Sequence, residues 1–171
     1  MADQVLENGN PMAGGGLPVA EPPHSIAQAR VDDKGRLKLP AEFAGYLKEI
    51  GVNKVFITTV DMELVRIYPT SLWNANEIFA ENASELKEDV DDIVYLAKYY
   101  GGDSDIDPQG RVLIPSELRK ELSLESQPVW IDCQRNGRIN VATKSVHEAR
   151  IHRAKADLIE KKKRVERNGF K

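Results

Sequence analysis

The sequence has little cysteine and no long apolar run, and each shortage excludes a class of protein. Cys133 is the only cysteine among the 171 residues, so an intrachain disulfide is impossible and a zinc module lacks its cysteine ligands. We expect this thiol to be a small buried hydrophobic side chain. No apolar stretch approaches the roughly 20 residues of a membrane-spanning helix, and residues 1–10 do not resemble a signal peptide. We therefore expect a cytoplasmic protein with no membrane partner.

Motifs of common enzymes and metal sites are missing as well. The sequence contains no Gly-rich phosphate loop, no nucleophile elbow and no cluster of histidines with carboxylates. His147 and His152 are five positions apart, so they diverge around a helix, and the acidic run at 88–92 lacks the ligand spacing of a calcium loop. We expect no catalytic residues, no metal, no cofactor and no small-molecule substrate.

Charges of both signs are plentiful but unevenly distributed along the chain. The net charge of −3 by itself disfavours a nucleic-acid partner, because phosphates attract cations. Residues 144–171, however, hold ten basic and four acidic residues, a net charge of +6. Residues 70–105 hold nine acids and two lysines, a net charge of −7. Local patches of either sign therefore persist within an acidic total.

A motif of thirteen residues occurs twice, 75 positions apart. Its copies read VDDKGRLKLPAEF, beginning at Val31, and IDPQGRVLIPSEL, beginning at Ile106. Asp, Gly, Arg, Pro and Glu recur in register, and the apolar positions agree as well. Such agreement indicates an internal duplication.

Each copy of the motif predicts a strand, a tight turn, a second strand and a short helix. An Asp followed three positions later by a Gly suits a type I turn, and these residues are Asp32 with Gly35 and Asp107 with Gly110. After each turn, alternation makes one face of the strand apolar and the other cationic. A proline then stands where each helix is expected to begin.

A second pair of strands follows each helix, so the repeated unit is β-β-α-β-β. These strands are expected at 55–60 and 64–68 in the first copy, and at 129–134 and 138–141 in the second. A unit of about 40 residues rarely buries enough apolar surface to be stable alone. We therefore expect an α+β protein whose two copies intertwine their hairpins into one closed barrel around a shared core.

The chain is accordingly divided into five parts. Residues 1–23, rich in Gly, Pro and small side chains, are expected to form a disordered tail. The two repeats occupy 24–69 and 105–143, with a helical connector at 70–104 between them. Residues 144–171 form a basic C-terminal helix and tail.

Both non-repeated segments have helical patterns. The connector is expected to hold two helices, the second introduced by a capping box of Asn82 and Glu85. One helix is expected over residues 145–167, where apolar residues recur every seven positions. These are Ile151, Leu158 and Val165. So narrow a stripe is suited to packing on another protomer.

The arginines that follow the turns are the candidate functional residues. Arg36 and Arg111 stand directly after the turn glycines on the predicted polar face, and Lys34 and Lys38 accompany the first of them. Guanidinium groups there can contact phosphates or guanine edges at two points. Alternatively, each arginine only pairs with its turn aspartate and fixes the hairpin. Duplication of the element favours binding, and the two roles are compatible because the aspartate would orient the arginine.

A basic run at 161–164 is a second cationic feature. It has two interpretations: nonspecific attraction to phosphates, or a solvated helix end, where cations are favourable in any case. We favour the helix end.

The two motifs resemble the paired motif of the MraZ family, a two-repeat relative of the AbrB-type (SpoVT-AbrB) swapped-hairpin DNA-binding proteins. The resemblance runs from about residue 25 to residue 153. The family's Asp-x-x-x-Arg signature falls on Asp32 with Arg36 and on Asp107 with Arg111. The resemblance implies an AbrB-like, double-psi-type β-barrel built from swapped hairpins. The long tail before His24 and the basic C-terminal helix depart from the family pattern.

The resemblance also implies a function. The protein would be a sequence-specific transcriptional regulator, not an enzyme, and would associate with the nucleoid. Its partners would be double-stranded promoter DNA, at direct repeats upstream of the division and cell-wall gene cluster that includes its own gene, and further copies of itself in a ring-shaped homo-oligomer. The alternative is a protein-interaction module, antitoxin-like or a scaffold barrel, that acts through the C-terminal helix.

Overall fold

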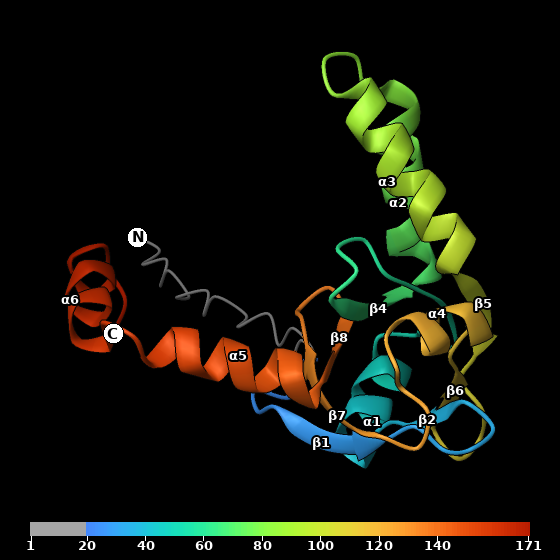
Figure 1. Cartoon of the computed structure of the whole chain (residues 1–171), viewed down its shortest axis with the longest axis horizontal. Coiled ribbons are helices and arrows are strands. Elements are labelled where there is room, and N and C mark those ends of the chain that lie inside the picture. The colour runs from blue at the N-terminus through green and yellow to red at the C-terminus, as the bar shows by residue number, and fades with distance from the viewer. Residues whose placement is uncertain (1–19) are drawn as a thin grey trace, which may run out of the picture.

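The computed structural model describes residues 20–171, and their arrangement is shown in Figure 1. Most of the predicted tail, residues 1–19, lies outside the described residues. The order of elements is β-β-α-β-β, two helices, β-β-α-β-β and two further helices. The α+β class and the repeated unit predicted from the sequence are therefore confirmed. Within the described part, no helix combines the length and apolar character that crossing a membrane requires.

The elements of each repeat follow the same plan. The first repeat contains β1 (Ala27–Arg30), β2 (Arg36–Lys38), α1 (Ala41–Glu49), β3 (Lys54–Thr58) and β4 (Leu64–Pro69). The second contains β5 (Gly102–Asp105), β6 (Arg111–Leu113), α4 (Ser116–Glu121), β7 (Pro128–Cys133) and β8 (Ile139–Thr143). The helices outside the repeats are α2 (Thr70–Asn82), α3 (Lys87–Tyr100), α5 (Lys144–Lys155) and α6 (Leu158–Arg167).

The strands form two antiparallel sheets in which the repeats exchange strands. The larger sheet has the order β1-β7-β8-β4-β3-β5, and β2 pairs with β6 in a separate two-stranded ribbon. The first strand of each repeat thus pairs with the third strand of the other repeat, β1 with β7 and β5 with β3. The two halves are interlocked and neither sheet belongs to one repeat alone.

An approximate two-fold axis relates the two repeats. Arg66 lies opposite Asn140 at the centre of the large sheet, and Leu37 lies opposite Val112 at the centre of the ribbon. Each of these pairs joins equivalent positions of the repeats, 74 and 75 residues apart in the sequence. The axis therefore passes from the ribbon through the protein to the middle of the large sheet.

One hydrophobic core lies between the ribbon and the large sheet, and both repeats contribute to it. Leu37 and Val112 reach it from the ribbon, while Ile57 and Ile131 reach it from the sheet, and all four are at most 1% exposed. Complete burial of side chains of this size contributes about 1.5–3 kcal/mol each. The prediction that the two copies share a core is confirmed.

The predicted closed barrel is not what the described strands form. The six-stranded sheet is open, with β1 and β5 at its edges. The ribbon strands have three residues each, and in the first repeat a single bridge between Val31 and Leu37 links β2 back toward β1. Strands this short exhaust their hydrogen bonds on each other, which leaves two sheets packed around a core.

The connector folds into the two predicted helices, which project from the sheets as an arm (Figure 1). At the base of the arm the Trp73 ring packs against those of Phe56 and Tyr68 at tilted angles, with ring centroids 4.6 and 5.2 Å away. The predicted capping box is wrong. Asn82 is instead the last residue of α2 and donates a hydrogen bond to the Ile78 carbonyl oxygen at 2.7 Å.

The C-terminal segment contains two helices where the sequence predicted one. Asp157 adopts a left-handed conformation with φ of 52°, which ends α5 and turns the chain into α6. The break separates Ile151 from Leu158 and Val165. The three side chains are 39%, 57% and 47% exposed, respectively. The three residues therefore form no common buried stripe within the described part of the chain.

Cys133 is only half-buried, whereas the sequence predicted a buried thiol. It packs against the edge of the core at the end of β7. Burial, aided by the neighbouring Asp132 carboxylate, raises the pKa of the thiol to about 11. The thiol therefore stays protonated near neutral pH.

Candidate nucleic-acid interface

The two turns of the repeated motif are built by identical hydrogen bonds. Asp32 Oδ1 accepts from the backbone N–H groups of Lys34 and Arg36 at 2.9 and 2.8 Å, and its Oδ2 accepts from Arg36 Nε at 2.8 Å. Asp107 accepts from the backbone of Gln109 and Arg111, each at 2.9 Å, and from Arg111 Nε at 2.6 Å. Each aspartate thus fixes both the turn and its arginine, the structural role considered from the sequence.

The turn glycines are required by their backbone conformation. Gly35 and Gly110 have φ of +79° and +74°, a region that costs other residues about 1–2 kcal/mol. Their carbonyl oxygens also tie the repeats together, accepting from Ile114 N at 3.0 Å and from Leu39 N at 2.9 Å. Each hairpin is therefore locked by the other repeat.

The ribbon presents the candidate residues on one outer face. Arg36 lies opposite Leu113, and Lys38 lies opposite Arg111. Side chains directly opposite in an antiparallel pair share a face, as do residues two apart on one strand. Arg36 and Arg111 are therefore diagonal neighbours, at a typical spacing of roughly 7–8 Å. The structure brings Arg36, Lys38 and Arg111 together.

Both arginines keep part of their hydrogen-bonding capacity. Their side chains are 35% and 32% exposed, and pairing with the aspartates uses the Nε atoms. The outer N–H groups of each guanidinium are not consumed by the aspartate. Arg111 Nη2 makes one longer contact, with Gln109 Oε1 at 3.3 Å. A phosphate or a base edge could be bound by these outer groups while the aspartate holds the arginine in place.

Hydrogen bonding keeps the turn aspartates ionised. For Asp32, the backbone hydrogen bond from Arg36 is the largest influence and lowers the pKa below its usual value. For Asp107, burial is the largest single influence and raises the pKa. Hydrogen bonds from the backbone and side chain of Arg111 lower it, and the net shift is downward. Each charged pair therefore persists at neutral pH.

The fourth predicted contact residue lies within the first turn. Lys34 is exposed and occupies the turn itself, one residue before Gly35. The corresponding position in the second turn is Gln109, and the position matching Lys38 is Leu113, 53% exposed. Within the two turns and the ribbon, lysines therefore occur only in the first repeat.

Sequence reasoning missed Arg119, which packs against the first turn from α4. Its guanidinium lies where a Cβ on Gly35 would be, its Nε donates to the Ile114 carbonyl oxygen at 3.1 Å, and its Nη1 pairs with Glu125 at 3.1 Å. At the second turn Ala44 takes the same place, 3.2 Å from the position of a Cβ on Gly110. Residues 44 and 119 are 75 positions apart, so the aligned repeats already contained this difference.

The duplicated unit, its exchanged strands and its paired Asp-Arg turns define a class of two-repeat proteins with interlocked halves. No model of a protein family matches the chain, but curated relatives do. A protein of Acidobacterium capsulatum named transcriptional regulator MraZ is 35% identical over 105 residues, which cover 61% of this chain and 72% of the relative. The chain belongs to the MraZ family.

Two further relatives carry the same name. The protein of Koribacter versatilis is 32% identical over 99 residues, covering 57% of this chain and 67% of the relative. That of an Anaeromyxobacter species is 28% identical over 122 residues, covering 71% and 83%. The family resemblance drawn from the two motifs is thereby confirmed.

Proposed function

We propose that this chain is a DNA-binding transcriptional regulator and that the outer face of the β2–β6 ribbon contacts the DNA. The observation that carries the proposal is the placement of Arg36 and Arg111, both partly exposed, on one face of one ribbon. A two-stranded ribbon fits the major groove, which is about 12 Å wide. The relatives' name supports a regulatory function.

The charge pattern of the ribbon supports the same surface. Lys38 and Arg111 lie directly opposite each other, and like charges at such a position destabilise a sheet. This pairing of two cations costs stability in the free protein, and a polyanion bound across the pair would explain why it is present. Phosphates of DNA would relieve the repulsion, and release of their counterions would add to the affinity.

The finer features of the proposal rest on the family resemblance. The fold is taken as AbrB-like with swapped hairpins, supported by the exchange of β1 and β5 between the repeats. Residues 24–69 and 105–143 would form the DNA-binding body, and the operator would be direct repeats in the promoter of the division and cell-wall cluster that includes the protein's own gene. The protein would act at the nucleoid in the cytoplasm.

Self-association into a ring is part of the same proposal. The connector arm exposes large apolar side chains that no other part of residues 20–171 covers. These are Ile78, Phe79, Leu86, Ile93, Tyr95 and Tyr99, each 47–78% exposed. A neighbouring copy would bury them, and several modest ribbon contacts would then add through effective concentration on repeated DNA.

The test is a footprint and a mobility-shift titration on the DNA preceding the protein's own gene, at two salt concentrations. We expect periodic protection at short direct repeats. Arg36→Ala and Arg111→Ala should each weaken binding strongly, while Arg135→Ala, which removes an arginine 77% exposed in another loop, should not. Unchanged binding by both ribbon variants would refute the site assignment.

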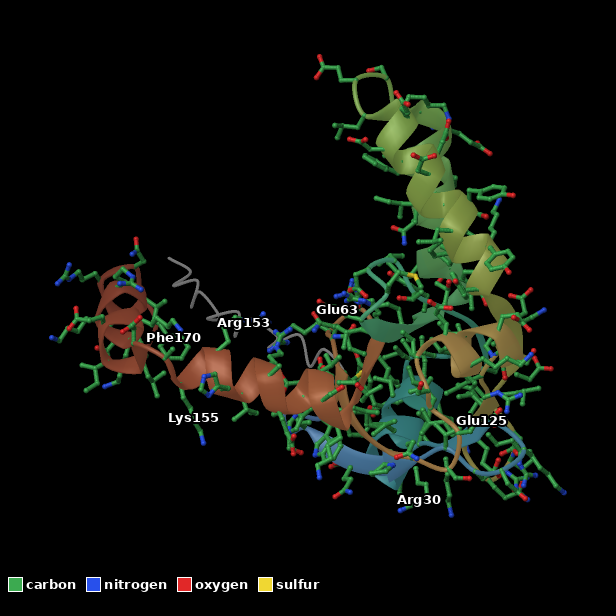
Figure 2. All side chains as sticks on the ribbon, in the orientation of Figure 1. Arg30, Glu63, Glu125, Arg153, Lys155 and Phe170 are labelled. Carbon is green, nitrogen blue, oxygen red and sulfur yellow. The ribbon has the colours of Figure 1, made fainter. Side chains whose placement is uncertain are left out.

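The C-terminal helices support a second candidate, a protein-interaction module. Helix α6 and the tail expose Leu158, Ile159, Val165 and Phe170 beside a basic run. Phe170 lies beside α6, away from the sheets (Figure 2). Deletion of residues 157–171 discriminates the two functions. Loss of a bound protein with DNA binding retained would favour the interaction module.

A further inference from the structure

A second cationic site lies on the outer face of the large sheet. A cavity of about 180 Å³ is enclosed by β4, β7, β8 and the first turns of α5. Three arginines line it, Arg66, Arg138 and Arg150, against one carboxylate, Asp132. The charged lining residues therefore sum to +2, or to +1 once the pairing of Arg66 with Asp61 is included.

One wall of the cavity is held by a hydrogen-bonded row across three strands. Arg66 donates to Asn140 Oδ1 at 2.9 Å and to Asp61 Oδ2 at 2.6 Å. Asn140 in turn donates to Asp132 Oδ2 at 3.0 Å. Such a network fixes the position of each member. The Arg66 side chain is only 16% exposed, so this wall is rigid and largely shielded from solvent.

Two buried donors in the site have no acceptor among the described residues. They are the Nε atoms of Arg66 and Arg138. Buried N–H groups are almost always paired in folded proteins, so these two guanidiniums are incompletely compensated. Both Nε atoms are shielded from the cavity itself, but two such guanidiniums beside one cavity, with an excess of positive charge, favour an anion within it.

Helix α5 forms the opposite wall of the cavity and packs on the sheet. The His147 ring stacks on Trp130 of β7, with centroids 4.8 Å apart and planes 5° from parallel. Thr143 caps the helix by accepting from Val146 N at 3.4 Å. Arg150 lies one turn beyond His147 on the same helix face, which places its long side chain at the cavity.

We propose that this cavity binds a small tetrahedral oxyanion of the phosphate class, with Arg138 and Arg150 as its principal ligands and Arg66 as a supporting charge. The guanidinium fork matches such anions at two points. The volume selects a small ligand, because sites for drug-sized molecules are typically about 300–1,000 Å³. Asp132, the one carboxylate of the lining, limits the negative charge that the site accepts.

The location separates this site from the ribbon. Arg66 alternates with Val65 and Ile67, which point into the core, so its side chain lies on the outside of the sheet. Leu37 and Val112 enter the same core from the ribbon. The core thus lies between the two cationic surfaces, and a duplex on the ribbon does not reach the cavity. The anion in the cavity is therefore not a phosphate of that duplex, and the proposal does not rest on DNA binding.

The experiment is a calorimetric titration of the full chain with inorganic phosphate and with sulfate, at ionic strength held constant with chloride. We expect saturable binding that weakens about tenfold in Arg138→Gln and in Arg150→Gln, as loss of a charge-assisted contact predicts. Asp132→Asn should strengthen binding about threefold. Arg135→Gln, an arginine of the same loop that does not line the cavity, should bind as the wild type does.

The Arg150→Gln variant keeps the result unambiguous. Arg150 is exposed on a helix, so its variant tests the site even if Arg138→Gln disturbs the β7–β8 hairpin. Absence of saturable binding by the wild type, or wild-type affinity in both Arg138→Gln and Arg150→Gln, would each overturn the proposal.

Discussion

The two repeats share one backbone design and differ in the side chains attached to it. Both turns use the same aspartate acceptors and a glycine of positive φ, yet Lys38 of the first repeat corresponds to Leu113 of the second. The buried side chains of the two motifs are alike, because both copies must fill one core. The exposed side chains are not constrained in this way, and their differences make the charge distribution of the ribbon asymmetric although its backbone is approximately two-fold.

The largest effect should come from the axis of the core, where the repeats meet. Leu37→Ala removes a fully buried side chain, and we expect it to lower the free energy of unfolding by about 2–5 kcal/mol. Val112→Ala, at the equivalent position, deletes fewer atoms and should cost less. Denaturant titrations measure both, with the exposed Val165→Ala as a control within about 0.5 kcal/mol of wild type. A larger loss for Val112→Ala would contradict the shared packing.

The two turn glycines should differ in their tolerance of a side chain. Gly35→Ala must adopt a disfavoured φ and also displace the Arg119 guanidinium from its contact with Ile114. We expect it to cost about 2–3 kcal/mol, the sum of backbone strain and a lost hydrogen bond. Gly110→Ala meets only Ala44 at 3.2 Å and should cost about 1–2 kcal/mol.

Thermal unfolding of the two glycine variants provides the comparison, with Gly35→Ala/Arg119→Ala as the diagnostic combination. Removing the guanidinium makes space for the new Cβ, so the double variant should lose less than the two single variants added together. Simple additivity would show that Arg119 does not distinguish the turns.

The sequence predicted the repeated parts of the protein well and the single-copy parts less well. The Asp32 and Asp107 turns, the paired arginines and the two helices after the prolines were all visible, because each pattern occurs twice and periodicity reports burial locally. Strand exchange was expected only in general terms. Which strand pairs with which is decided by contacts between residues about 45–104 positions apart, and no local pattern encodes them.

The errors have local physical causes. Asn82 looked like a helix cap, but helix α2 extends through it. The stripe of Ile151 and Leu158 suggested a continuous helix, but Asp157 turns left-handed between them. The barrel was expected to close, yet three-residue ribbon strands pair only with each other. The outer-face arginines escaped attention because Arg66 and Arg138 lie far apart in the sequence and belong to no motif.

Charge substitutions on the ribbon would test the asymmetry directly. Lys38→Gln should reduce the slope of log affinity for DNA against log salt by about one, since one phosphate contact is lost. Leu113→Lys restores the cation that the second repeat lacks and should raise the slope by a similar amount. Mobility shifts across a salt series measure both. Equal slopes in the two variants would mean that this face does not contact phosphates.

The smallest effect should appear in the acid response of the two turns. The pKa values of Asp32 and Asp107 are both lowered in the folded protein. A carboxyl with a lowered pKa stabilises the fold above its unfolded value, and this stabilisation is lost as the pH falls through the folded value. Below the reference value of 3.8, the turns should therefore weaken progressively. Asp32→Asn and Asp107→Asn should already be less stable at neutral pH.

The difference in unfolding temperature between wild type and each variant should accordingly shrink on acidification. The two aspartates need not contribute equally. Hydrogen bonding from Arg36 is the largest influence on the pKa of Asp32, whereas for Asp107 the largest influence is burial, which opposes the hydrogen bonds from Arg111. The net pKa shift is downward for both, so we expect both turns to lose stability on acidification. A gap that widens as the pH falls would mean that the carboxylates do not stabilise the turns in their charged form.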